Sequence, residues 1–229
     1  TENHDQVSFL DPFCGSGTIA IEAAAMALGL PPGRLLDAPL QGTTLFDPAN
    51  WERLVRASVP QNCSKDAERI QIQASDRDEG AIKATQSNAE RAGVLGFITT
   101  RVCAFSAHPW LENAPDTGKL LVAANLPFGH RLKSPSSKNG KARSHHRQQL
   151  PLYQTFASRM NTLSDKKQDL GAIFLTNDPN LLHRSGFRHE FDSALSTLHG
   201  GIKVSCMRLQ RSQADGMRES NNERAASKE

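Results

Sequence analysis

Residues 7–18 read Val-Ser-Phe-Leu-Asp-Pro-Phe-Cys-Gly-Ser-Gly-Thr, and this stretch decides the fold. It joins a short apolar run, Val7–Leu10, to a loop that contains two glycines. The Ala-rich segment 18–28 follows, apolar on nearly all sides, and stops at Gly29. This order predicts a buried parallel strand, a glycine-rich turn and a buried helix.

The alternation of strand and helix resumes after residues 29–68, which we interpret as an insertion with one short helix near 48–58. Asp78 can cap a helix that runs to about Ala92. The other expected elements are strands at 69–74, 96–103, 119–124 and 170–176, helices at 150–163 and 178–185, and a hairpin at 196–209. Alternating elements predict an α/β fold with a mostly parallel sheet and an antiparallel edge hairpin.

The glycine loop narrows the choice of cofactor. Such a turn brings the backbone close to a ligand and presents the positive end of the helix. A P-loop requires Lys and then Ser or Thr after the second glycine, and Thr18-Ile19 exclude it. A dinucleotide fingerprint has a third glycine where Ala20 stands and an acidic residue about 20 positions on, whereas Asp76 comes far later.

S-adenosylmethionine fits the loop and Asp76 together. Its carboxylate would lie at the amides of Gly15–Thr18, its ammonium near Asp11, and its ribose hydroxyls at Asp76. A solvated turn with a helix cap is the other interpretation of Asp76 and Asp78.

The stretch Asn125-Leu126-Pro127-Phe128-Gly129 follows the apolar run 120–124 and suits a flat base with an amino group. This nitrogen is a poor nucleophile because its lone pair is delocalised, and the carbonyls of Asn125 and Leu126 can aim it by accepting its protons. Pro127 removes a competing donor, and Phe128 offers a stacking face worth about 1–3 kcal/mol. A base paired in a helix must first be extruded, and no metal is required. An ordinary strand exit is the alternative.

Segments 11–24 and 125–131 together resemble two motifs of the THUMP-associated (UPF0020-type) RNA guanine methyltransferases. These motifs are Asp-Pro-x-Cys-Gly-Ser-Gly-Thr-x-x-Ile-Glu-Ala-Ala and Asn/Asp-x-Pro-Phe/Tyr-Gly-x-Arg. The resemblance covers about residues 7–210. It implies a class I methyltransferase with a seven-stranded Rossmann-like sheet, which methylates the 2-amino group of guanosine in ribosomal or transfer RNA with S-adenosylmethionine.

The chain departs from this family at three points. Leu126-Pro127-Phe128 replaces the Pro-Pro-Tyr of many members and is closer to eukaryotic and archaeal transfer-RNA members. Cys103-Ala104-Phe105 stands where an acidic residue often faces the adenine, so Phe105 and backbone groups are expected there. The upstream THUMP domain is absent from this chain.

The expected catalytic residues are Asn125, Pro127 and Phe128. The expected cofactor residues are Asp11, Pro12, Phe13, Cys14, Gly15, Ser16, Gly17, Thr18, Asp76, Arg77, Phe105 and Asn125.

A basic loop is predicted at residues 130–150, directly after the amine motif. It contains no acidic residue, and its Lys and Arg residues are Arg131, Lys133, Lys138, Lys141, Arg143 and Arg147. Phosphate contacts from such a segment give affinity for RNA without sequence specificity. A solvated linker is the alternative.

The length of 229 residues suits one catalytic domain at 1–210, and the polar segment 211–229 reads as a disordered tail. The net charge of +3 is too small to argue for nucleic acid by itself. No apolar run is long enough for a membrane span, and no signal peptide is visible. The four cysteines lie far apart, so they predict no metal site and no disulfides. This pattern predicts an intracellular, cytoplasmic setting. The start of the chain suggests a fragment of a longer protein.

Two other functions stay open at this point. An adenine amino-methyltransferase acting on RNA or DNA would use the same Asn-x-Pro-Phe pattern. A non-catalytic module that binds S-adenosylmethionine and RNA would keep both motifs, and an activating subunit is a further expectation.

Overall fold

The computed structural model describes residues 6–33, 35, 41–58, 69–114, 118–128, 143–166, 169–199 and 201–210. The chain divides into two compact units, Thr1–Ala124 and Asn125–Glu229. In the described part of the chain the sheet has seven strands in the order β3-β2-β1-β4-β5-β7-β6. Parallel pairs in the first unit and an antiparallel hairpin in the second confirm the α/β fold class predicted from the sequence.

The first unit is built on parallel strands. These are β1 (Val7–Asp11), β2 (Ile70–Asp76), β3 (Ile98–Val102) and β4 (Lys119–Asn125). β1 lies between β2 and β4, and Val7 is in register with Ile70 on one side and Lys119 on the other. Because the strands are parallel, β1 and β2 end at the same edge of the sheet with Asp11 and Asp76.

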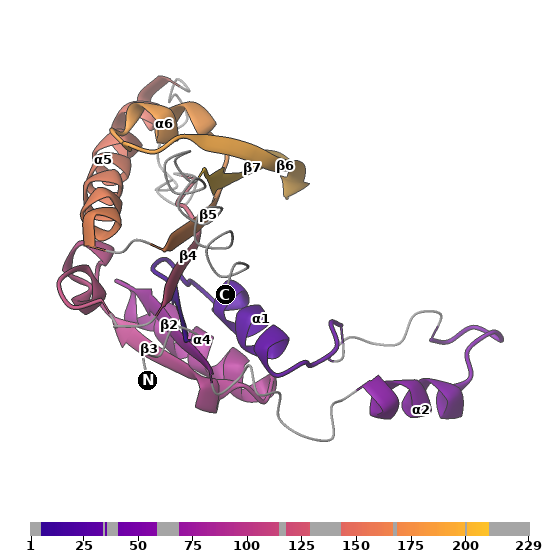
Figure 1. Ribbon diagram of the computed structural model, residues 1–229. Helices are drawn as coiled ribbons and strands as arrows, with labels where there is room; N and C mark the ends of the chain where they lie inside the picture. Colours follow the sequence, from indigo (N-terminus) through magenta and orange to yellow (C-terminus); the bar gives the residue numbers. More distant parts are fainter. Residues whose placement is uncertain are drawn as a thin grey trace, which may run out of the picture. The chain divides into compact units, whose positions relative to one another are not determined.

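Two helices cover one face of these strands (Figure 1). They are α1 (Thr18–Ala27) and α4 (Glu79–Arg91), and their apolar sides meet the strands in one core. This core contains Ala20, Ala24, Ile72, Ala74, Ile82, Ala89 and Ile98. The alanines of α1 allow a close approach to the sheet. The helix ends as predicted, with Gly29 at φ 68° and the Leu30 amide donating to the Ala25 carbonyl at 2.8 Å.

Among the described residues, the connections of the first unit include short 3-10 turns and the helix α2 (Pro48–Ser58). α2 confirms the short helix expected in the insertion. The strand expected at 96–103 is shorter, because the turn η1 (Leu95–Phe97) precedes β3. After β3 come η2 (Phe105–Ala107) and η3 (Pro109–Leu111).

His108 caps the last of these turns. Its Nδ1 accepts the Trp110 amide at 3.2 Å, and burial lowers the pKa of this imidazole to about 4.

The second unit carries an antiparallel hairpin. β5 (Leu170–Thr176) pairs with β7 (Ile202–Leu209), which pairs with β6 (Phe191–His199). The hairpin begins five residues before the predicted Ser196, because a bulge between Ser193 and Leu195 lets the pairing continue beyond it. β6 ends the strand order, and its side chains Leu195 and Leu198 are exposed.

The helices in the described part of the second unit are α5 (Arg143–Lys166) and α6 (Pro179–Arg184). The predicted start of α5 at Leu150 is wrong, because the helix begins seven residues earlier, inside the predicted basic loop. The apolar positions at helical spacing begin only at Leu152. Pro151 lies inside the helix, where it removes only one backbone donor, and the helix continues past it. Among the described residues no helix is long and apolar enough to cross a membrane.

Aromatic rings form the centre of the second unit. Phe156 of α5 and Phe174 of β5 meet edge to face at 5.0 Å, and Phe187 and Phe191 meet at 4.9 Å. Phe174 also contacts Phe191 at 5.7 Å. The rings therefore join α5, β5 and the start of β6 into one core.

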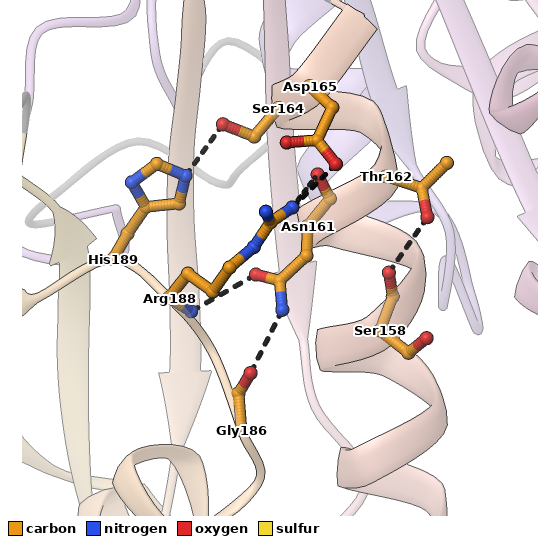
Figure 2. A network of polar contacts seen from close by, with 8 residues as sticks. All are labelled: Ser158, Asn161, Thr162, Ser164, Asp165, Gly186, Arg188 and His189. Carbon is orange, nitrogen blue, oxygen red and sulfur yellow. Dashed lines mark hydrogen bonds and ion pairs between the residues drawn. The ribbon is translucent and has the colours of Figure 1, made fainter.

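Figure 2 shows a polar network that joins α5 to the turn before β6. The Asn161 side chain accepts the Arg188 amide at 3.1 Å and donates to the Gly186 carbonyl at 2.9 Å. The Arg188 guanidinium donates to the Asp165 carboxylate at 2.6 Å and to the Asn161 carbonyl at 2.9 Å. Ser164 and His189 are hydrogen-bonded at 2.6 Å. We name these contacts the α5 network.

Candidate active site

The loop after β1 begins with a buried carboxyl group. Asp11 is 1% exposed, and its Oδ1 accepts the Phe13 amide at 3.3 Å. Burial raises the pKa of Asp11 from 3.8 to about 7, the Phe13 hydrogen bond opposes this, and the negative charge of Asp76 raises it further. Neither acid pairs with a cation in the described part of the chain. A positively charged ligand would therefore supply the counter-charge that these two acids lack in the described residues.

Asp76 fastens the loop to the end of β2. Its Oδ2 accepts the Gly15 amide at 3.1 Å, and its Oδ1 accepts the Asp78 amide at 3.0 Å. A carboxylate has about four acceptor sites, so two remain for a ligand. Asp78 caps α4 as predicted and accepts the Gly80 amide at 2.8 Å. Arg77, between the two acids, is exposed.

The glycine loop makes a tight turn into α1. The Gly17 amide donates to the Cys14 carbonyl at 2.7 Å, and the Cys14 amide donates to the Ser75 carbonyl at 3.0 Å. Gly17 lies at φ 88°, the left-handed region that favours glycine. Burial raises the pKa of Cys14 to about 12, so its thiol stays protonated at neutral pH and fills the turn. Pro12 is also buried.

Two amides of this loop donate to no protein group in the described residues, those of Ser16 and Thr18. Both residues are exposed. From the sequence we expected the carboxylate of S-adenosylmethionine to lie at the amides of Gly15–Thr18. The structure reduces the available donors, because the amides of Gly15 and Gly17 are bound to Asp76 and Cys14.

Thr85 and Asn88 of α4 contact the loop and were not among the predicted site residues. Thr85 donates to the Gly15 carbonyl at 3.1 Å, and Asn88 donates to the Ser16 carbonyl at 2.8 Å. A signal did exist in the sequence, since Thr85 stands between Ile82 and Ala89 on the apolar side of the helix. A polar residue there requires a partner.

The ring of Phe105 lies against Phe13, with centroids 6.1 Å apart. Phe105 is buried and Phe13 half-buried. The segment is tied to the acid pair, because the Cys103 amide donates to the Asp76 carbonyl at 2.9 Å. The predicted residues Phe13, Asp76 and Phe105 thus belong to neighbouring segments of the first unit.

The amine motif belongs to the end of β4 and the start of the second unit. Asn125 and Pro127 are exposed, Phe128 is half-buried, and Leu126 is buried. The Leu126 amide donates to the Leu175 carbonyl at 3.0 Å, which fixes the backbone between two exposed residues. The polar and the ring-bearing positions therefore stay available to a ligand.

The predicted RNA-binding residues lie mostly outside the described chain. Arg143 and Arg147 are on α5 and not in a loop, which corrects the predicted extent of the basic segment. Outside the described residues are Gly129, Arg131, Lys133, Lys138 and Lys141.

Comparison with known proteins gives both a family and relatives. The model of the UPF0020 family, described as RMKL-like, methyltransferase domain, matches residues 1–184. A protein of Legionella pneumophila (strain Corby) named ribosomal RNA large subunit methyltransferase K/L is 34% identical over 200 residues, 87% of this chain and 25% of the relative. Its namesake from strain Philadelphia 1 is 33% identical over 203 residues, 88% and 26% of the two chains. The chain thus spans about a quarter of the length of these relatives.

Two solved structures share the fold. SMU.472, described as a methyltransferase complexed with SAH, has a TM-score of 0.67 and 21% identity, over 91% of this chain and 49% of that chain. A protein of Clostridium difficile 630, described as a methylase, has a TM-score of 0.67 and 20% identity, over 90% and 48%.

Proposed function

Because this chain belongs to UPF0020, the family of RMKL-like methyltransferase domains, we propose that it transfers a methyl group from S-adenosylmethionine to RNA. The acceptor is the 2-amino group of a guanosine in large-subunit ribosomal RNA. The observation that carries the proposal is the buried Asp11 beside the half-buried Asp76, with no cationic partner in the described residues, next to a glycine loop in which the Ser16 and Thr18 amides have no protein acceptor there.

The first unit offers complementary groups for the methyl donor. The ammonium of S-adenosylmethionine brings positive charge to Asp11, and the two remaining acceptor sites of Asp76 suit the ribose hydroxyls. Its carboxylate can accept from the amides of Ser16 and Thr18, where the α1 dipole also favours an anion. The related fold of SMU.472 was solved with SAH, the product of such a donor, which supports the same ligand here.

The amine motif supplies what the acceptor needs. Asn125 is exposed at the end of a strand whose pairing with β1 is parallel. Its side-chain carbonyl and the Leu126 carbonyl can each accept one proton of an amino group, which turns the nitrogen lone pair out of conjugation. Phe128 can stack on the base, and Pro127 offers no competing donor.

The proposed role of this chain's residues is to bind the methyl donor and the acceptor base and to orient them, because a methyl group on a sulfonium is already activated for transfer. The methyl carbon leaves sulfur with sulfur keeping the bonding electrons, a nitrogen–carbon bond forms, and the nitrogen releases one proton to water. Asp11 and Asp76 hold the donor, while Asn125 holds the acceptor. The basic segment after the motif, including Arg143 and Arg147, is proposed to contact RNA phosphates, and the whole protein's further domains are proposed to recognise the RNA.

The substrate class rests on two supports. Relatives over 87% of this chain are named for methylation of large-subunit ribosomal RNA. The choice of the guanine 2-amino group rests on the resemblance of Asn125–Phe128 to guanine methyltransferases. Transfer RNA and an adenine amine are the outcomes that would redirect the proposal.

The test is methyl transfer to ribosomal RNA from cells that lack the gene, followed by digestion to nucleosides. We expect 2-methylguanosine, and methyladenosine alone would overturn the proposed acceptor. Asn125→Ala should abolish turnover and leave the affinity for S-adenosylmethionine within about twofold, since Asn125 orients the acceptor and the other expected cofactor residues remain in place. Asn113→Ala, an exposed asparagine away from the motif, is the control. Absence of S-adenosylmethionine binding in calorimetry would contradict the enzyme proposal itself.

A further inference from the structure

We propose that Thr85 and Asn88 of α4 are positioning residues, which hold the glycine loop so that the Ser16 amide faces the carboxylate of the methyl donor. The inference rests on the proposed function and extends it to two side chains that do not touch the donor.

The contacts are direct hydrogen bonds from one helix to two successive carbonyls. Thr85 Oγ1 donates to the Gly15 carbonyl at 3.1 Å, and Asn88 Nδ2 donates to the Ser16 carbonyl at 2.8 Å. Thr85 is fully buried, and its hydroxyl also lies 3.4 Å from the Cys14 sulfur, so it is held between the Gly15 carbonyl and that thiol, both of which belong to the loop. Arg91 donates to Asn88 Oδ1, which turns the Nδ2 end of the carboxamide toward the loop.

Peptide geometry converts these bonds into a direction for the amides. In a trans peptide the carbonyl of one residue and the N–H of the next point to opposite sides. When Thr85 binds the Gly15 carbonyl, the Ser16 N–H must point away from α4. When Asn88 binds the Ser16 carbonyl, the Gly17 N–H also points away, and it donates to the Cys14 carbonyl at 2.7 Å.

The remaining loop peptide is fixed from the other side. The Gly15 amide is bound to Asp76, so the orientations of three consecutive peptides are all determined by hydrogen bonds. Of the amides of Gly15, Ser16 and Gly17, only that of Ser16 is left without a protein acceptor in the described residues. An anion at this loop therefore finds the Ser16 donor already aimed.

The methyl group of Thr85 adds a steric restraint. A Cβ placed on Gly17 would lie 2.7 Å from Thr85 Cγ2 and 2.9 Å from Thr85 Oγ1. Gly17 is thus packed against the same side chain that binds the Gly15 carbonyl, at a backbone φ of 88° that other residues rarely adopt. One threonine therefore restrains both ends of the turn.

The test measures the affinity for S-adenosylhomocysteine by calorimetry and the KM for S-adenosylmethionine in three variants. Thr85→Val keeps the shape and removes the donor, Thr85→Ser keeps the donor, and Asn88→Ala removes the second bond. We expect Thr85→Val and Asn88→Ala to weaken donor binding about fivefold to tenfold, the usual effect of losing one hydrogen bond. Thr85→Ser should stay within about twofold, because it keeps this bond. The KM for the donor should rise while kcat and the KM for RNA change little.

Thr100→Val is the matched control. It removes the bond of 2.8 Å between Gln86 and Thr100, which also involves a side chain of α4 but not the loop. Its donor affinity should equal that of the unaltered protein. Melting temperatures for all variants separate loss of folding from loss of positioning.

Three results would overturn the inference. They are unchanged donor affinity in both Thr85→Val and Asn88→Ala, equal weakening in Thr85→Ser and Thr85→Val, and a loss confined to kcat. If Thr85→Val does not fold, Asn88→Ala decides, because Asn88 is only partly buried. A failure of the unaltered protein to bind S-adenosylhomocysteine would instead overturn the proposed function, and this inference with it.

Discussion

Two polar networks of this protein differ in whether they contain their own cation. In the α5 network, Asp165 is paired with Arg188 at 2.6 Å, and both side chains are more than half exposed. At the glycine loop, Asp11 is buried, faces the charge of Asp76, and has no cationic partner in the described residues. In the α5 network the acidic side chain already has a cationic partner. At the glycine loop, burial of a carboxylate without a cation lowers the stability of the fold until a positively charged ligand binds. Two neighbouring acids without a cation thus indicate a binding site, whereas the exposed and paired α5 network indicates a structural role.

Among the variants that test this difference, Asp11→Asn should have the largest effect, on both stability and donor affinity. The folded-state pKa of about 7 lies above 3.8, so the stability that Asp11 contributes is fully present below pH 4 and is lost as the pH rises through 7. Removing the charge should therefore raise the free energy of unfolding of the ligand-free protein at pH 8 by up to about 4 kcal/mol. Chemical denaturation at pH 8 and pH 4 measures this, and the gain should nearly vanish at pH 4.

The same substitution should weaken S-adenosylmethionine binding about 100-fold at pH 8, since a charged hydrogen bond is lost. A variant that is both less stable and fully able to bind would contradict the assignment of Asp11 to the ligand.

The pH dependence of donor affinity is the next largest expectation. A cation binds the ionised form of Asp11, so affinity should rise roughly tenfold from pH 6 to pH 7.5 as the competent fraction grows. His108, with a pKa of about 4, titrates below this interval. Calorimetry across the range should give a sloping profile for the unaltered protein and a flat one for Asp11→Asn.

Asn161→Ala tests the other side of the contrast. It removes the bonds to the Gly186 carbonyl and the Arg188 amide, and should lower the free energy of unfolding by about 1 kcal/mol. The affinity for S-adenosylmethionine should not change, because we assign no ligand contact to the α5 network. Thermal unfolding and calorimetry measure the two quantities, with Asn113→Ala as the exposed control. A marked loss of affinity would remove the distinction between the two networks.

Arg188→Met should have the smallest effect. The guanidinium pairs with Asp165 in solvent, so the expected loss of stability is under about 1 kcal/mol and smaller still at high salt. Urea unfolding at low and high ionic strength measures it. A salt-independent loss of several kcal/mol would mean that this ion pair is far less solvated than its exposure indicates.

The sequence predicted most of the fold because hydrophobic period and turn residues are local signals. Asp78 marked the start of α4, Gly29 the end of α1, and the apolar run at 170–176 became β5. The start of α5 was wrong because residues 143–149 contain no apolar residue, so the apolar spacing that revealed the helix begins only after its first two turns. The start of β6 was wrong because a bulge has no clear composition signal.

The site was predictable to the level of loops and not of individual amides. The glycine pattern placed Asp11 and Asp76 at the ends of adjacent strands, as found. The local sequence could not show that the Gly15 amide is used internally, because its acceptor Asp76 is 61 residues away, whereas the Gly17 amide is used by the Cys14 carbonyl within the turn itself. Thr85 and Asn88 were missed because they act across about 70 residues of sequence separation.

The edge strand β6 has a consequence for handling the protein. Its exposed Leu195 and Leu198 lie on a strand at the end of the sheet order, where unpaired backbone groups can accept a strand from another molecule. The bulge at Ser193–Leu195 twists the edge and limits such pairing over the first half of the strand only. At the concentrations used for crystals or spectra, the second half of β6 is therefore a site where self-association is expected, and Leu198→Lys should reduce it.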